Sequence, residues 1–491
     1  MKGRVMNTSI MAGLMAIVVV VLAMLASVPK TSAIPAFSRK YQTSCTTCHN
    51  NYPELNDFGE AFKKNGFKFP KDDETFVKEP PVLLGSKAQK EAFPEAVYPG
   101  EIPGFLPIAF RYSGNFNWNA KQPAAVIAAS GYTPRTDLFA PNTFTIISAG
   151  SFGQNLAFWI DNDISTNGSG ALGGLGDGYL RYNDLGHKFG LPLNAFNVRF
   201  GQFELDLPFS QARTIYPSSY DIFSETSVAG PPGTTNNPFF LGTPQRGIEF
   251  GGYPNNGNFT WSVAIVDGTN SAYGQTFPLN TRNTKDVYMR VSQRFNLERD
   301  PESRNAIQAA GPTGPRDHTS IRFGAFYYYG KNQLNLDGVT FPGLGVINEP
   351  FYRVGGALRF KYRHLELFGV GMYGHDQNLT ENSTATGFVP AKPVKFSGGF
   401  AGTNYWIFPW MIGYMRYDFV NSPTDFANGT PASQYATRNR FSPGYQILVR
   451  ANIKVIGEYQ YHWGQPYTNP VTGATQYFRP NSFVTGIDYV F

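Results

Sequence analysis

Two cysteines and a histidine lie close together near the start of the chain, at Cys45, Cys48 and His49. They are the only cysteines among 491 residues, and they are too close to form a disulfide that joins distant parts of a fold. Cys-Thr-Thr-Cys-His is the pattern by which a c-type haem is attached. The thiols add to the two vinyl groups of the porphyrin, and the adjacent imidazole reaches the iron from one face. We therefore expect one covalent haem c, held by Cys45 and Cys48 and ligated axially by His49.

Two other kinds of site use paired cysteines. A redox dithiol normally opens a helix in a strand–helix–strand unit, and half of a zinc site needs two more Cys or His ligands nearby. The sequence around Cys45 and Cys48 has neither feature. The pair also follows an export signal closely, as expected for a haem that is attached outside the inner membrane. Haem attachment is therefore the preferred interpretation.

Apolar residues recur at helical spacing directly after the haem motif, which predicts a helix that packs against the macrocycle. Proline suits its first turn, basic residues lie in its last turn, and glycine suits the position after its end. The alternative is that this apolar stripe packs on protein alone. The residues that form the pattern are Pro53, Leu55, Phe58, Phe62, Lys63, Lys64 and Gly66.

The sixth iron ligand has no obvious source near the motif, because residues 34–106 contain no Met and no His besides His49. The iron is either five-coordinate or takes a ligand from elsewhere, including a Lys or an Asn. Candidates placed inside the predicted barrel or in its turns also have a simpler interpretation as solvated residues, so we assign none of them. They are Met372, His462, His318 and His187, whereas Met289, Met411 and Met415 are expected to face lipid.

The N-terminus reads as a secretory signal over residues 1–33. Lys2 and Arg4 precede an apolar run at 10–27, and Thr31-Ser32-Ala33 is a small-residue cleavage site. The alternative is an uncleaved anchor helix, although the run is short for a membrane span. Loss of this segment would lower the formal charge from +6 to +3, a mild excess that does not favour nucleic acid as a partner.

From residue 107 onward, apolar and polar side chains alternate in segments of strand length. In the segment 352–362, Val354 and Leu358 share one face, while Arg353 and Lys361 share the other. The segments 286–295 and 454–464 follow the same rule. No apolar stretch after residue 33 is long enough for a spanning helix. This alternation, with charges on the polar face, is typical of a membrane barrel with a wet lumen.

The connections and the C-terminus support the same fold. Short connections are expected near 150–154, 186–192, 253–258, 363–364 and 451–454. Long ones are expected near 119–141, 205–242, 331–350, 376–393, 420–440 and 465–480. The connection at 298–318 breaks this alternation and should lie on the periplasmic side. The chain ends on the alternating segment 483–491, with a terminal Phe. We predict an all-β fold, an outer-membrane antiparallel β-barrel of about 16 strands, preceded by a small α-helical haem segment.

Four regions follow from these observations: a signal peptide at 1–33, a monohaem head at 34–68, a Pro-rich connector at 69–106 and the barrel at 107–491. Ala36-Phe37-x-Arg39 shortly before Cys45-x-x-Cys48-His49, with a barrel that ends in Phe491, resembles the fused monohaem cytochrome–porins. These include the outer-membrane iron-oxidising cytochromes of the cytochrome 572 type. The motif match covers about residues 36–66, and the rest is a match of architecture.

The resemblance implies that electrons pass across the bacterial outer membrane between an extracellular donor or acceptor, such as Fe(II) or another metal, and a periplasmic carrier such as a cytochrome. It places the haem on the periplasmic side or within the lumen. It also implies that the outward-facing side of the strands contacts outer-membrane lipid. Iron-oxidase activity is compatible with this scheme. The alternative is a solute porin whose haem is structural or sensory, and the third class is a haem enzyme such as a peroxidase.

Overall fold

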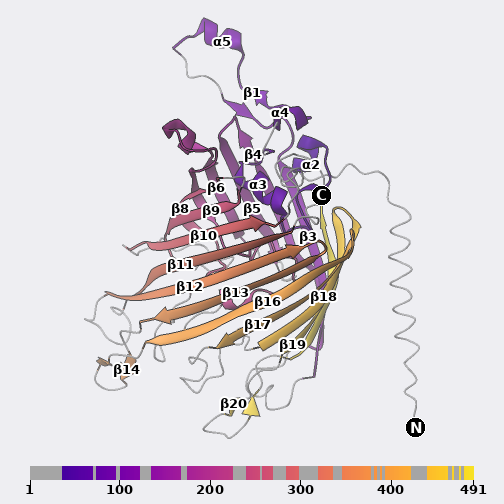
Figure 1. Ribbon diagram of the computed structural model, residues 1–491, viewed down its shortest axis with the longest axis vertical. Helices are drawn as coiled ribbons and strands as arrows, with labels where there is room; N and C mark the ends of the chain where they lie inside the picture. The colour runs from indigo at the N-terminus through magenta and orange to yellow at the C-terminus, as the bar shows by residue number, and fades with distance from the viewer. Residues whose placement is uncertain are drawn as a thin grey trace. The chain divides into compact units, whose positions relative to one another are not determined.

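A computed structural model describes most of the chain beyond the N-terminal segment (Figure 1). It describes residues 36–69, 73–95, 100–121, 134–166, 174–224, 239–254, 257–268, 284–297, 319–335, 346–377, 381–383, 387–389, 393–421, 439–462, 467–468, 475–476 and 480–491. The predicted signal segment and His318 lie outside this part of the chain. Among the described helices, none combines the length and the hydrophobicity that a membrane span requires.

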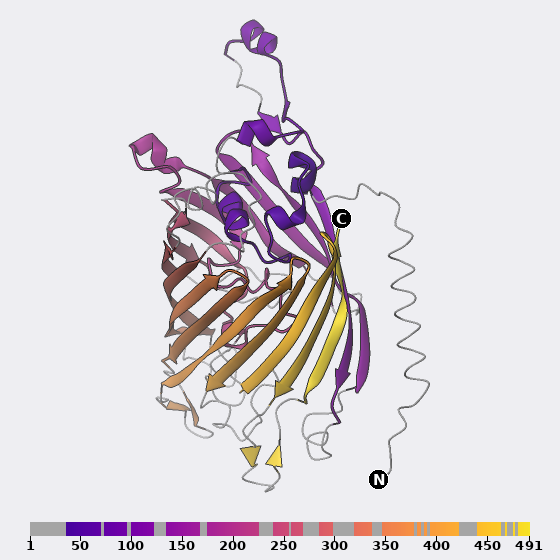
Figure 2. The same cartoon turned by 45° about the vertical axis from the view of Figure 1, so that its right-hand side comes forward.

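Sixteen antiparallel strands form one closed barrel, as predicted. Each strand pairs with its neighbour in the chain, and β22 closes the sheet by pairing with β3 (Figure 2). Closure leaves no open edge in the barrel sheet. The strands are β3 Ile108–Asn119, β4 Thr136–Phe152, β5 Leu156–Thr166, β6 Gly174–Tyr182, β7 Asn197–Phe203, β8 Gln245–Gly252, β9 Phe259–Val266, β10 Asp286–Asn296, β11 Ser320–Asn335, β12 Val346–Tyr362, β13 Leu365–Asp376, β16 Val394–Phe408, β17 Met411–Asn421, β18 Asn439–Arg450, β19 Ile453–His462 and β22 Ser482–Val490.

Side chains alternate between the lumen and the outer surface as the sequence predicts. In β12, Arg353 is fully buried and Lys361 is buried, whereas Val354 and Leu358 are exposed. The same alternation holds in β10 and β19. Apolar side chains therefore cover much of the outer face, including Leu138, Ile160, Leu180, Phe200, Ile265, Met289, Val291, Phe323, Leu367, Met415 and Ile487.

Short connections occupy one end of the barrel. The turns at 153–155, 253–258, 363–364 and 451–452 confirm the predicted short connections, and a further short one joins β16 to β17. The predicted short turn near 186–192 is longer, spanning 183–196 with the 3-10 helix η2 (Leu185–Phe189). By strand count, β10 ends and β11 begins at this short-turn end, so the connection predicted at 298–318 starts and finishes there, as expected. The first barrel strand begins and the last one ends at this end too. The backbones of Phe110 and Phe491 hydrogen-bond to each other there.

The residues before the barrel form a small helical head, which we define as residues 36–69. It contains α2 (Ala36–Tyr41), the 3-10 helix η1 (Cys45–Thr47) and α3 (Asp57–Lys64). The predicted helix begins later than expected, because the Asn56 side chain accepts a hydrogen bond from Gly59 N and caps the N-terminus of α3. Leu55 therefore lies outside the helix. Gly66 follows the C-cap with φ +71°, as predicted.

The segment predicted as a Pro-rich connector contains short elements. These are α4 (Asp73–Phe76), β1 (Val82–Leu83), α5 (Lys87–Ala92) and β2 (Glu101–Ile102). β1 pairs with β2, and these two strands form a separate small sheet. Two further small strand pairs lie in long connections: β14 (Glu381–Ser383) with β15 (Gly387–Val389), and β20 (Tyr467–Thr468) with β21 (Thr475–Gln476).

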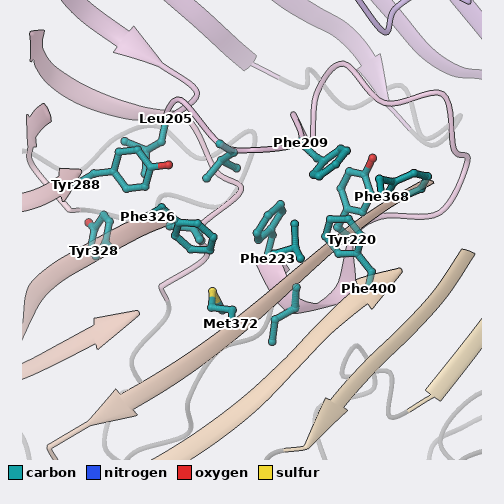
Figure 3. Packing of buried hydrophobic residues seen from close by; sticks show 14 of the residues in the cluster. Leu205, Phe209, Tyr220, Phe223, Tyr288, Phe326, Tyr328, Phe368, Met372 and Phe400 are labelled. Atoms are coloured by element: carbon teal, nitrogen blue, oxygen red, sulfur yellow. The ribbon is translucent and has the colours of Figure 1, made fainter. Parts of the chain in front are cut away.

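Residues 204–224, which we call the inner loop, cross the lumen after β7. Tyr288 Oη of β10 donates to Asp206 O over 2.7 Å, and Arg416 Nη2 of β17 donates to Ser218 O over 3.1 Å. Aromatic side chains of the loop pack on inward-facing residues of the wall, such as Tyr220 on Phe400 with 4.3 Å between ring centroids. Figure 3 shows these side chains converging from the loop and the strands. The loop ends in the 3-10 helix η3 (Asp221–Ser224), where Ile222 and Phe223 are fully buried.

Candidate haem-attachment site

The structure brings the three predicted site residues to one cavity. Ser44 caps η1, and its hydroxyl accepts a hydrogen bond from Thr46 N over 3.4 Å. The turn continues with a hydrogen bond of 3.0 Å from His49 N to Cys45 O. Cys45, Cys48 and His49 all line the same cavity of about 360 Å³, which we call the haem cavity. The local fold therefore presents two thiols and an imidazole to a space within the usual size range of ligand pockets.

The two thiols are free and not joined in a disulfide. Burial raises the pKa of both, that of Cys48 to about 12, so they are neutral thiols at physiological pH. A redox-active dithiol normally has a lowered pKa, because the thiolate is the reactive species. In the described part of the chain, no group of three or more His, Cys, Asp or Glu side chains is arranged to hold a metal ion. The raised thiol pKa values argue against the redox alternative.

His49 is held in the form that binds a metal. Its Nδ1 lies 3.3 Å from the carbonyl oxygen of Glu54. Because a carbonyl oxygen can only accept, Nδ1 carries the proton and Nε2 keeps its lone pair. Burial lowers the pKa of His49 to about 4, so the ring is neutral at physiological pH. A histidine oriented in this way by a backbone carbonyl is typical of an axial metal ligand.

Aromatic side chains surround the haem cavity from both the head and the barrel. Phe37 stacks on Phe67 at 5.1 Å, and Tyr41 stacks on Phe69 at 4.2 Å. Trp159 of β5 lies 5.6 Å from Phe67, so the barrel wall completes the enclosure. Such walls offer a porphyrin a large apolar contact area. The residues present therefore fit a covalently attached haem.

Helix α3 packs closely on the attachment segment at Gly59. A Cβ atom built on this glycine would clash with the carbonyl oxygen of Cys48. Asn56 strengthens the contact, because its backbone N–H donates to that carbonyl over 3.0 Å. Its side-chain amide also donates to Thr47 O over 3.0 Å. Gly59 thus lets the helix lie directly against the haem motif.

Ion pairs and hydrogen bonds attach the head to the inside of the barrel at its short-turn end. Asp57 of α3 lies 3.2 Å from Arg294 of β10 and 3.3 Å from Lys361 of β12. Lys454 of β19 donates to Tyr52 O over 2.6 Å. All three barrel cations are buried residues whose strand neighbours face outward. The head is therefore seated in the mouth of the lumen.

None of the described distal candidates lines the haem cavity. Met372 points inward as predicted, but it packs in the apolar cluster around the inner loop (Figure 3). His462 directs Nδ1 to Pro480 O over 3.1 Å, and His187 is exposed in η2. Among the described residues that line the cavity, His49 is the only His and there is no Met. The described lining therefore leaves the sixth ligand unassigned.

The haem cavity is also lined by polar residues that the sequence did not single out. Arg111 is held by two hydrogen bonds to Asp488, at 3.1 and 2.9 Å. Arg213 of the inner loop is held by Asp177 at 2.9 Å and by Glu204 at 3.0 Å. Alternation along β3 could have placed Arg111 inside, since it shares a face with the buried Ala109. Nothing in the sequence indicates that Arg213, which lies in a loop, reaches this cavity.

No family model and no curated protein matches the chain. Solved structures with a similar fold include OmpF of Salmonella typhi in complex with daunomycin, at 11% identity and a TM-score of 0.47. That match covers 79% of this chain and 98% of the other. The outer membrane channel DcaP of Acinetobacter baumannii matches at 11% identity and a TM-score of 0.47, covering 78% and 96%. OmpT of Vibrio cholerae, expressed in the outer membrane, matches at 9% identity and a TM-score of 0.43, covering 84% and 100%.

Proposed function

We propose that this chain is a bacterial outer-membrane c-type cytochrome that carries electrons between an extracellular redox partner and a periplasmic carrier. One observation supports the proposal most directly. Cys45, Cys48 and His49 line an aromatic cavity inside the mouth of a closed barrel whose lumen is crossed by a packed loop. A haem at this site would lie where it could bridge an insulating layer, and the inner loop packs its side chains inside the lumen.

The outer surface of the barrel supports the membrane placement. Apolar side chains on the outward faces would be costly in water, and lipid would cover them. Each barrel strand has hydrogen-bonded neighbours on both sides, as a hydrocarbon environment requires. The short-turn end, which contains the head, would face the periplasm as in other outer-membrane barrels. This orientation would place the haem cavity near a periplasmic carrier.

Haem bound at this site would supply one-electron exchange between Fe(II) and Fe(III). Cys45 and Cys48 would hold it, and His49 Nε2 would ligate the iron. The aromatic rings of the head would exclude water from it, and Arg111 and Arg213, which are already paired with carboxylates, line the same cavity. Of the lining residues, Trp159 belongs to the barrel and Arg213 to the inner loop, so the haem cavity exists only when all three parts are assembled.

A solute porin with a structural or sensory haem is the second candidate. A 16-stranded barrel is wide enough for an aqueous channel, and charged residues line this lumen. The inner loop favours the electron-transfer function, because buried residues such as Ile222 and Phe223 occupy the interior. Single-channel conductance separates the two functions, since a filled lumen should be nearly silent and an open porin should conduct.

Sealed proteoliposomes test electron transfer directly. The haem-loaded protein is reconstituted around an impermeant internal oxidant, and an impermeant reductant is added outside. We expect internal reduction at a rate proportional to the haem content. The Cys45→Ala/Cys48→Ala protein, which cannot attach haem, serves as the control for leakage. Equal rates in both proteins, or no covalent haem in the wild type from an export-competent host, would refute the proposal.

A further inference from the structure

A second cavity, which we call the chamber, lies beside the haem cavity inside the lumen. Its volume is about 140 Å³. Helix α3, the inner loop and wall strands from β6 to β12 enclose it. Lys63 and Arg213 line both the chamber and the haem cavity, so the two spaces adjoin.

Many of the described residues that line the chamber are charged: nine are Lys or Arg and six are Asp or Glu. Five of the cations are neutralised by ion pairs. These pairs are Arg199–Glu249 at 2.5 Å, Arg213–Glu204 at 3.0 Å, Arg290–Asp206 at 2.8 Å, Arg294–Asp57 at 3.2 Å and Arg359–Glu366 at 2.8 Å. The charge of each of these five cations is therefore already balanced by a carboxylate.

Four cations of the chamber have no carboxylate within 4 Å among the described residues: Lys63, Lys64, Arg181 and Arg322. Among the described residues, Arg322 donates to two neutral oxygens, Ser292 Oγ and Gly257 O, each at 3.2 Å. Arg181 is only 9% exposed, and its Nε has no hydrogen-bond partner in the described part of the chain. The guanidinium of Arg181 lies over the Tyr253 ring, with 5.9 Å to its centroid, but a buried N–H without an acceptor is costly, so it marks a place for an anionic ligand.

The acids left in the chamber do not balance these cations. Glu54 and Glu60 are its two carboxylates without an ion pair among the described residues. At most two negative charges therefore oppose four unpaired positive ones.

We propose that the chamber binds a small inorganic oxyanion of the phosphate class. Its volume corresponds to about four or five waters at roughly 30 Å³ each, room for one tetrahedral oxyanion. Guanidinium and ammonium groups are the usual protein ligands of such anions. Haem propionates offer similar anionic oxygens, and Lys63 lies where they could reach. Arg181 and Arg322 line the chamber but not the haem cavity, which favours a separate ligand.

Isothermal titration calorimetry of the haem-loaded full chain with sodium phosphate, at constant ionic strength in detergent, tests the proposal. We expect one site per chain. Arg181→Met and Arg322→Met should each weaken binding about tenfold or more, equivalent to about 1.4 kcal/mol. Arg363→Met is the matched control. Arg363 is exposed in the β12–β13 turn, and its substitution removes the same charge at the same end of the barrel. It should change the affinity less than twofold.

Two results would overturn the oxyanion site. One is the absence of phosphate binding to the haem-loaded protein, and the other is an equal loss of affinity in all three variants. If only the haem-free Cys45→Ala/Cys48→Ala protein binds phosphate, the chamber belongs to the haem carboxylates, and the proposal of a separate ligand is wrong. Circular dichroism of the sheet checks that each variant folds. The experiment does not depend on electron transfer, so a protein that binds phosphate but moves no electrons would refute only the proposed function.

Discussion

Replacing Asp57 with Asn tests whether ion pairs with the wall hold the head in the lumen. Asp57 neutralises Arg294 and Lys361, at 3.2 and 3.3 Å, and the three side chains are 13%, 4% and 9% exposed. The substitution keeps the shape of the side chain but leaves both cations without their carboxylate. Breaking a buried pair in this way costs about 3–5 kcal/mol. Because Asp57 retains some contact with water, we take the lower end, about 3 kcal/mol.

About 3 kcal/mol corresponds to a roughly hundredfold increase in the population of the open head. Hydrogen–deuterium exchange of peptides that cover 57–66 measures this opening, while peptides from β12 report on the barrel. We expect exchange in α3 to accelerate about a hundredfold and exchange in β12 to change little. Glu74→Gln is the control. Glu74 is an exposed residue of α4, and its substitution removes one charge from the neighbouring segment. Exchange rates for Asp57→Asn within twofold of the wild type would show that the ion pairs do not hold the head.

Three further predictions follow. Burial alone would raise the pKa of the Asp57 carboxyl, but Lys361 and Arg294 hold this pKa well below its ordinary value. The stability that ionised Asp57 contributes is therefore complete above about pH 4 and is lost as the pH falls below that. Protease sensitivity of the head should rise between pH 4 and pH 2 in the wild type and much less in Asp57→Asn. Gly59→Ala should separate α3 from Cys48 and lower the haem content per chain, as measured by pyridine haemochrome absorbance, whereas Ala61→Gly should retain it. Ile222→Ala/Phe223→Ala should open the packed interior and raise single-channel conductance at least severalfold, and unchanged conductance would mean that the inner loop does not block the pore.

The barrel could be predicted because its physics is local and periodic. In β12, every second residue from Arg353 to Lys361 faces the lumen, and a two-residue turn at 363–364 follows where the pattern breaks. Alternation of period 2 fixes which face each residue joins, and chain parity fixes the end at which each turn lies. The least accurate prediction was the connection at 183–196, where the short helix η2 lengthens the turn.

The candidate site could be predicted only in part. The spacing of Cys45, Cys48 and His49 is local, and the structure brings all three to one cavity. The start of α3 was predicted too early, because the capping geometry of Asn56 competes with an apolar pattern that includes Leu55. The positions of Arg213 and Trp159 depend on the inner loop and on head–barrel packing. Contacts between segments so distant in sequence leave no periodic signal in the chain.

Charge explains why the head and the barrel should form one unit. The lumen wall at the short-turn end carries Arg294, Lys361 and Lys454, all buried. In an empty barrel Arg294 and Lys361 would face water, and in the assembled protein they face Asp57. Lys454 is paired with Asp488 of the barrel at 3.3 Å and also donates to the carbonyl oxygen of Tyr52. Inserting the head removes water from around these cations, which is favourable only while Asp57 remains ionised. Insertion of the head therefore depends on the same residues that set its position, and the haem cavity can be complete only after the lumen has been filled.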